Sequence, residues 1–105
     1  MHRLGGRYGQ PDDPAAFDAD YRDTHTTLAT QMPGLVRLTT GSPQPLDPSQ
    51  SAPYLVAQLD FESEKEMGAA FNSSEGKAAA DDIGNFATGG ATMTHYELTE
   101  VHAAR

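Results

Sequence analysis

The chain has 105 residues, of which 37% are hydrophobic, and its 15 acidic and 7 basic residues give a formal net charge of −8. This length suits one domain, spanning 1–105, with a modest core of the kind that self-association often stabilises. The basic residues form no cluster, which argues against nucleic acid and anionic membranes as partners. Cysteine is absent, which excludes disulfides, thiolate nucleophiles and cysteine-ligated metals.

The sequence contains no apolar run long enough for a membrane span. The first nine residues, MHRLGGRYG, also lack the apolar segment of a signal peptide. A cytoplasmic location is therefore the default expectation.

Residues 2–8 predict a first strand, although Gly5 and Gly6 weaken it because an interior glycine costs about 0.5–1 kcal/mol. Residues 14–31 predict a helix, with Asp13 as N-cap and Pro14 at the first helical position. One apolar and aromatic stripe follows the helical period and consists of Phe17, Tyr21, His25, Leu28, Ala29 and Met32.

Residues 35–41 predict a second strand, and a loop rich in proline and serine follows it. The clearest strand is 53–62, in which alternate residues form two faces. We expect one face to enter the core, and it consists of Leu55, Ala57, Leu59 and Phe61. The mixed opposite face suits coverage by a second subunit, and it consists of Tyr54, Val56, Gln58 and Asp60.

Residues 63–72 predict a helix that begins with a capping box of Ser63 and Glu66. Ser74 is expected to cap a further helical segment, 75–83, before a loop over 85–90. Residues 91–100 predict the last strand from their alternation and β-branched content.

The resulting order is β-α-β-β-α-β, which predicts an α+β, ferredoxin-like fold. Its four-stranded antiparallel sheet carries both helical segments on one face. No segment remains to cover the other face, so we expect two copies to pack sheet to sheet as a homodimer.

Two segments carry a family resemblance: YGQPDDPAAFDADYRDTHTTLATQMPGL at 8–35 and SSEGKAAADDIGNFATGG at 73–90. They resemble the EthD family, most specifically in Tyr21-x-x-x-His25 and Pro33-Gly34-Leu35. The resemblance implies a dimeric α/β-barrel tied to ether degradation beside a cytochrome monooxygenase. Related barrels include lactone isomerases, polyketide cyclases, cofactor-free monooxygenases and haem-degrading enzymes, and the fold does not choose among them.

The first strand departs from the apolar strands typical of this family, because it reads Leu4-Gly5-Gly6-Arg7-Tyr8. One interpretation is a strand weakened by a bulge. The other is an altered strand in which Gly5 and Gly6 enlarge a cavity and Arg7 places a charge at its wall. The second pattern also fits deliberate redesign of a pocket.

His25 is the leading candidate for chemistry, because a neutral histidine in a partly buried site is a suitable general base. Tyr21 lies one turn earlier, where it can hold a substrate oxygen. The alternative is a core histidine bonded to a backbone carbonyl or a carboxylate. His95 is a possible third catalytic residue if its strand face looks toward the helices, or else an ordinary strand histidine at a dimer interface.

His2 and His102 lie near the termini and are expected to be exposed. No ligand spacing indicates a metal site. The acidic groups Asp12-Asp13, Asp81-Asp82 and Glu62/Glu64/Glu66 are interpreted as helix caps and solvated surface.

Three functions fit these residues. The first is a cofactor-independent enzyme of the isomerase, lyase or oxygenase type that acts on a small apolar molecule between the first helix and the sheet. The second is a non-catalytic ligand-binding or accessory protein of a degradation pathway, and the third is a haem-binding protein. Expected substrate contacts are Gly5, Gly6, Arg7, Tyr8, Phe17, Phe86 and Met93.

Overall fold

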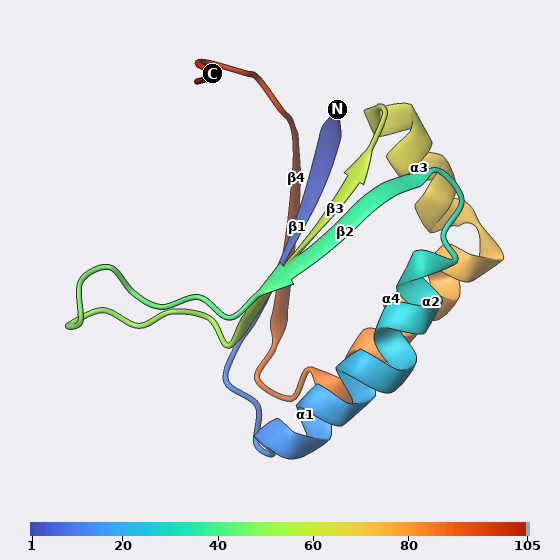
Figure 1. Cartoon of the computed structure of the whole chain (residues 1–105). Coiled ribbons are helices and arrows are strands. Elements are labelled where there is room, and N and C mark those ends of the chain that lie inside the picture. Colours follow the sequence, from blue (N-terminus) through green and yellow to red (C-terminus); the bar gives the residue numbers. More distant parts are fainter. Residues whose placement is uncertain (105) are drawn as a thin grey trace.

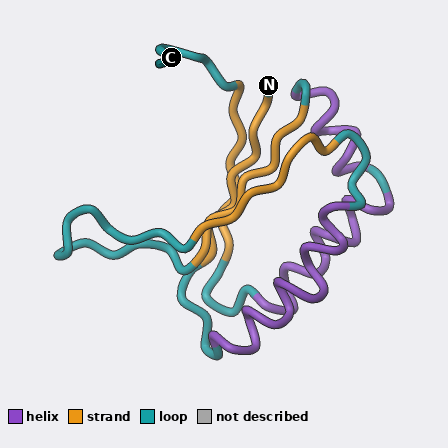
Figure 2. Tube along the Cα trace, viewed as in Figure 1, coloured by secondary structure: helices purple, strands orange, loops and turns teal. Residues whose placement is uncertain are grey.

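A computed structural model describes residues 1–104 of the chain. Four strands form one antiparallel sheet in the order β2-β3-β1-β4, and all helices cover the same face of it (Figures 1 and 2). The strands are β1 (His2–Tyr8), β2 (Leu35–Gly41), β3 (Leu55–Phe61) and β4 (Ala91–Glu97). The predicted ferredoxin-like α+β fold is confirmed.

The first helical region comprises α1 (Pro14–Asp20), η1 (Tyr21–His25) and α2 (Thr26–Thr30). As predicted, Asp13 caps it, since the Asp13 side chain accepts a hydrogen bond of 3.2 Å from the amide of Ala16. No helix within residues 1–104 has the length and apolar character needed to cross a bilayer.

The second helical region comprises α3 (Glu64–Asn72) and α4 (Ser74–Phe86). Ser63 caps α3 as predicted, but Ser74 is not the cap of α4. Ser73 takes that role, because its extended backbone lets its hydroxyl accept from the amide of Gly76. Helix α4 also continues to Phe86, so the predicted loop is shorter than expected. Gly76 lies directly against the carbonyl of Ala70, where any side chain would clash.

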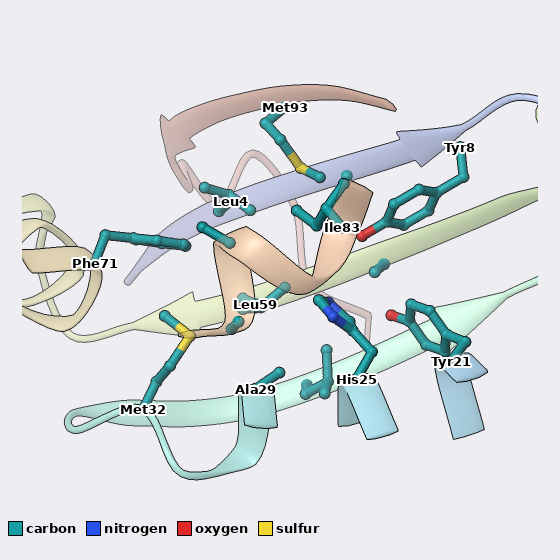
Figure 3. Close-up of a pocket in the computed structure, with 15 residues that line it drawn as sticks. Leu4, Tyr8, Tyr21, His25, Ala29, Met32, Leu59, Phe71, Ile83 and Met93 are labelled. Atoms are coloured by element: carbon teal, nitrogen blue, oxygen red, sulfur yellow. The ribbon is translucent and has the colours of Figure 1, made fainter. Parts of the chain in front are cut away.

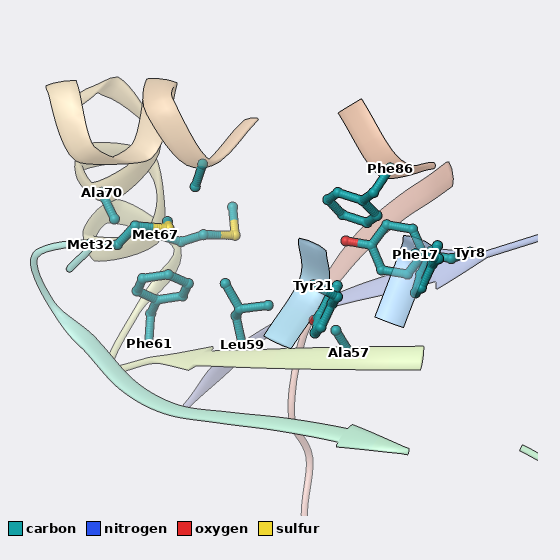
Figure 4. Close-up of a cluster of buried hydrophobic side chains, with 11 residues drawn as sticks. Tyr8, Phe17, Tyr21, Met32, Ala57, Leu59, Phe61, Met67, Ala70 and Phe86 are labelled. Carbon is teal, nitrogen blue, oxygen red and sulfur yellow. The ribbon is translucent and has the colours of Figure 1, made fainter. Parts of the chain in front are cut away.

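The core lies between the sheet and the helices (Figure 4). The predicted inward face of β3 is confirmed, with Ala57, Leu59 and Phe61 buried and Leu55 packed against the cluster. At one end, aromatic rings gather at centroid distances of 5.0–5.9 Å, and Phe17 lies at their centre. This end of the core holds the helical stripe in place.

The opposite face of the sheet carries a row of charges across three neighbouring strands. Asp60 is only 3% exposed, and Arg3 donates two hydrogen bonds to its carboxylate, at 2.8 and 3.0 Å. Arg37 donates a third, at 3.3 Å. The hydrogen bonds from Arg3 hold the pKa of Asp60 below its usual value, so the buried carboxylate stays charged and paired.

Candidate active site

The candidate site begins with a π-helical turn in the first helical region. Residues Tyr21–His25 form η1, and the amide of Thr26 donates to the carbonyl of Tyr21, five residues back. The Thr26 hydroxyl also bonds the carbonyl of Arg22 at 2.7 Å. Such back-bonding offers helical carbonyls an alternative partner. Single π turns inside α-helices occur frequently at functional sites.

The π turn keeps the helical stripe on one face. In an α-helix, each step of four residues overshoots a full turn by about 40°. A π turn is wider and holds more residues, so four residues do not complete a full turn in it. The step from Tyr21 to His25 therefore does not add to the rotation beyond a full turn made between Phe17 and Tyr21. All three side chains, and Ala29 after them, are therefore buried on the same face.

A cavity of about 280 Å³ lies between this face and the sheet (Figure 3). Its polar side chains are those of Tyr8, Tyr21 and His25. The rest of the wall is apolar and consists of Leu4, Gly6, Ala29, Met32, Leu38, Ala57, Leu59, Phe71, Ala79, Ala80, Ile83 and Met93. The cavity therefore offers an apolar ligand space for most of its body and a few polar contacts near His25.

His25 forms a buried pair with Asp82 of α4. Its Nδ1 lies 3.2 Å from Asp82 Oδ2, and the two residues are 6% and 5% exposed. The side-chain amide of Asn85 donates to the other carboxylate oxygen at 3.0 Å. An ionised carboxylate accepts but does not donate, so Nδ1 carries the proton. The lone pair of a neutral His25 is then on Nε2, which has no hydrogen-bond partner within residues 1–104.

Two opposing effects set the protonation of His25. Burial lowers its pKa below the usual value, and this effect is the larger one. The hydrogen bond and the charge of Asp82 raise the pKa, with a smaller contribution from Asp20. The net result is a histidine that is neutral at pH 7 and is held in one tautomer.

Two tyrosine hydroxyls point into the same part of the cavity (Figure 3). Burial raises the pKa of Tyr21 to about 12. Burial, with smaller contributions from Tyr21 and Asp82, also raises the pKa of Tyr8. Both groups therefore remain protonated donors at neutral pH. Neither hydroxyl has a hydrogen-bond partner in the described part of the chain, so both are available to a ligand oxygen.

Asp20 stands beside the pair from the end of α1. Burial raises its pKa, and the neighbouring Asp82 carboxylate adds to this effect. Its Oδ2 is buried and has no partner within residues 1–104. Repulsion between the two carboxylates thus favours the protonated form of Asp20.

Five predicted site residues meet at the cavity, and five do not. Those that line it are Gly6, Tyr8, Tyr21, His25 and Met93. Outside the lining are Gly5, Arg7, Phe17, Phe86 and His95.

Strand alternation explains two of the misplaced residues. Gly5 and Arg7 are one position out of phase with Gly6 and therefore point to the face without helices. The expectation that Gly5 enlarges the cavity and that Arg7 charges its wall is wrong. The predicted bulge is wrong as well, because β1 pairs with β3 and β4 without a register shift.

The two phenylalanines lie behind the site. Phe17 is 2% and Phe86 3% exposed, and both belong to the aromatic core. Phe86 does contact the site residue, with its ring centroid 4.8 Å from that of His25. Both rings therefore support the His25 face from behind the cavity wall.

Gly6 shapes the cavity through its neighbour. A Cβ at this position would lie 3.0 Å from the sulfur of Met93 and 3.3 Å from its methyl group. The flexible Met93 thioether therefore occupies space that a side chain at position 6 would fill. This part of the first strand does border the cavity.

His95 faces the helices, yet it does not join His25. Its Nδ1 lies 2.9 Å from Nε2 of His2, at the end of the sheet where α3 begins. His2 is 4% exposed, so the expectation of an exposed His2 is wrong. His2 is buried because β1 is an inner strand of the sheet and pairs with β4 on one side.

Asp82 is the candidate-site residue that the sequence interpretation missed. It was assigned to a solvated surface with Asp81. The available signal is its phase on α4, because the buried residues of this helix are Gly76, Ala79, Asp82 and Phe86. A carboxylate on a buried helical stripe requires a partner, and His25 supplies it.

Comparison with known proteins identifies the family. Residues 10–90 match the EthD domain. The chain belongs to the EthD family. An uncharacterised 11.0 kDa protein from the thcB–thcC intergenic region of Rhodococcus erythropolis is 46% identical to this EthD protein over 93 residues, 89% of this chain and 90% of the relative.

Solved structures agree with the EthD assignment. An EthD-family protein from Bacillus halodurans superposes with a TM-score of 0.84 at 30% identity, over 94% of this chain and 99% of that one. SnoaB from Streptomyces nogalater, described as a cofactor-independent oxygenase, gives a TM-score of 0.68 at 16% identity, over 95% and 94%. The second likeness shows that the EthD protein shares its fold.

Proposed function

We propose that this EthD-family protein catalyses proton transfer on a small apolar molecule in the His25 cavity without a dedicated cofactor. The observation that carries the proposal is the buried His25–Asp82 pair at the wall of an apolar cavity. A volume of about 280 Å³ lies near the lower end for small-molecule pockets, roughly 300 Å³. It suits a ligand of one or two rings.

The chemistry follows from the free Nε2 and the two hydroxyls. Nε2 of His25 removes a proton from a carbon next to a carbonyl group, and the electron pair of that C–H bond moves to the carbonyl oxygen. Tyr8 and Tyr21 donate hydrogen bonds to the enolate oxygen. Return of the proton to the same carbon completes an exchange, and return to the γ-carbon of a β,γ-unsaturated ketone gives the conjugated isomer, so atoms and electrons balance without a co-reactant. Asp82 holds the tautomer and stabilises the imidazolium that forms.

The relatives support small-molecule chemistry of this kind. The Bacillus halodurans relative belongs to a family named for ethyl tert-butyl ether. SnoaB, with the same fold, is described as a cofactor-independent oxygenase, so the fold accommodates catalysis without a cofactor. A degradative role for the present protein is part of the proposal.

Deuterium exchange into 2-tetralone, an enolisable two-ring ketone, tests the proposal. Proton NMR in D₂O should show exchange at the carbons beside the carbonyl that is at least tenfold faster with protein than in buffer. Tyr21→Phe should slow it, because one donor to the enolate oxygen is lost. If 2-tetralone binds but its protons do not exchange, the proposal of an enzyme is wrong and the protein is a ligand-binding accessory protein. If haem titration gives a Soret band that requires His25, the protein is instead a haem-binding protein.

A matched pair of glycine variants tests the location of the ligand. Gly6→Val should weaken binding of 2-tetralone at least tenfold, because the new side chain and the displaced Met93 enter the cavity. Gly5→Val is the control, since its Cβ meets only the Thr94 hydroxyl, at 3.9 Å, on the other face. Titration followed by NMR measures both, and equal effects would place the ligand elsewhere.

The uncovered sheet face supports a homodimer as part of the same proposal. Tyr96 is 49% exposed on this face beside the Arg3–Asp60 pair, and every residue of β4 is exposed. A solved Thermobifida fusca neighbour of 15% identity, with a TM-score of 0.70, is described as dimeric. Tyr96→Asp should convert the dimer to a monomer in light-scattering measurements. A monomeric wild-type protein would contradict this.

A further inference from the structure

Two histidines and a glutamate converge outside the His25 cavity. His2 comes from β1, His95 from the adjacent β4, and Glu64 is the first residue of α3. His2 Nε2 lies 2.9 Å from His95 Nδ1, and Oε1 of Glu64 lies 4.0 Å from the first and 3.8 Å from the second. Three elements thus bring one potential ligand atom each to a common point.

We propose that this His2–His95–Glu64 cluster binds a divalent transition-metal ion, with Zn²⁺ as the best match. Two imidazole nitrogens and one carboxylate oxygen form a ligand set typical of zinc. Calcium and magnesium prefer oxygen ligands alone. The formal charge of the cluster with neutral histidines is −1, which also favours a cation.

The separations suit a tetrahedral ion. Zinc bonds to nitrogen and oxygen are about 2.0–2.2 Å long, which places tetrahedral ligand atoms roughly 3.3–3.5 Å apart. The observed separations of 2.9, 3.8 and 4.0 Å lie on either side of that range. His95 and Glu64 are exposed and can adjust by the remaining few tenths of an ångström, while buried His2 supplies a fixed ligand.

The second nitrogen of His2 provides an independent observation. Its Nδ1 is buried and has no hydrogen-bond partner within residues 1–104. The nearest carboxylate oxygen is Oε1 of Glu97, at 3.6 Å. A histidine that binds zinc through one nitrogen usually donates the other N–H to a carboxylate. Glu97 stands where that outer carboxylate is required, and a small movement completes the hydrogen bond.

The position of the cluster indicates what the ion does. It joins the edge strand β4, exposed along its whole length, to β1 and to the start of α3. The start of α3 is fixed by Ser63, whose hydroxyl accepts a hydrogen bond of 3.1 Å from the amide of Glu66. A bound ion would therefore clamp the sheet edge to the helical layer, and its fourth position would hold water. This site is separate from the proton-transfer site and does not depend on it.

Calorimetric titration of metal-free protein with ZnCl₂ tests the site. The protein should carry no histidine tag and should be compared with His95→Ala and Glu64→Gln. We expect one Zn²⁺ per chain, with affinity at least tenfold weaker in each variant. Zn²⁺ at 100 times its dissociation constant should also lower the unfolded fraction about 100-fold. CoCl₂ should give the strong visible absorption of a tetrahedral site.

Two control variants keep the test specific. Glu66→Gln alters an exposed carboxylate in the same turn of α3, and His102→Ala removes a histidine outside the cluster. Both should bind Zn²⁺ as the wild type does. The proposal is overturned if His95→Ala retains full affinity, if His102→Ala loses it, or if the wild type binds no Zn²⁺. Loss of binding in His25→Gln would also overturn it, because the ion would then occupy the cavity.

Discussion

Replacing His25 by glutamine is expected to lower kcat/KM for proton transfer by about 10²–10⁴-fold, the range typical of a lost general base. Glutamine has a similar length and can still hydrogen-bond to Asp82, but it cannot accept a proton at neutral pH. The 2-tetralone exchange assay measures the loss. Binding of the ketone should change less than turnover, because the apolar wall of the cavity remains.

The pH profile of the wild type distinguishes a base from a structural histidine. The proposed proton transfer requires neutral His25, so the rate should rise with pH through the pKa of this group. Because burial lowers that pKa, the midpoint of the acidic limb should lie below 6.5 and the rate should be level by pH 7. Tyr21 keeps its proton to a pKa of about 12, so no decline is expected before about pH 10.

Asp82→Asn separates positioning from proton transfer. The variant removes the negative charge that raises the pKa of His25, so the acidic limb should move to lower pH while the plateau rate falls at least tenfold. Circular dichroism verifies that each variant is folded. Full activity in folded His25→Gln, or an unshifted limb in Asp82→Asn, would contradict the assigned roles.

Phe17→Ala is expected to lower the free energy of unfolding by about 3–5 kcal/mol, the usual effect of truncating a buried phenylalanine. Phe17 is 2% exposed and its ring stacks on Tyr21 at 5.9 Å and meets Phe86 edge-on at 5.1 Å. The variant leaves a void that these rings cannot fill without moving. Small domains have a total stability of about 5–15 kcal/mol, so the loss is a large share of it.

Urea denaturation and thermal melting measure the effect of Phe17→Ala. For a domain of this size the melting temperature should fall by roughly 15–30 °C. Leu46→Ala is the control, because Leu46 is fully exposed in the loop between β2 and β3 and should change stability by less than about 0.5 kcal/mol. Similar losses in both variants would contradict the packing described for Phe17.

Local chemistry made much of the fold predictable. The Asp13–Pro14 start and the Ser63 cap are signals confined to a few residues, and both were confirmed. The alternation in β3 correctly separated the face toward the helices from the opposite face. The start of α4 was wrong because two adjacent serines, Ser73 and Ser74, offer the same capping group. In the structure Ser73 is the cap, and Gly76, whose amide it binds, lies against the carbonyl of Ala70. The sequence does not reveal this contact.

The candidate site was predictable where it depends on one helix. Tyr21 and His25 follow from a single periodic stripe, and both line the cavity. Asp82 lies 57 positions from His25, so their contact arises from the packing of two helices and has no local signature. The faces of β1 and β4 required the pairing register, which is why Arg7 and His95 were placed in the wrong surroundings.

The π turn at Tyr21–His25 makes this helix tolerant of a change in length at that turn. A wide turn accommodates one more residue than an α-helix of equal rise. Deleting one residue between Tyr21 and His25 would therefore restore an ordinary helix and leave Ala29 and Met32 in phase with the core. The same deletion in the regular turn of α2 would rotate everything after it by about 100° and carry Met32 out of the core. A change in chain length is thus absorbed at the π turn and not in the helical turns on either side of it.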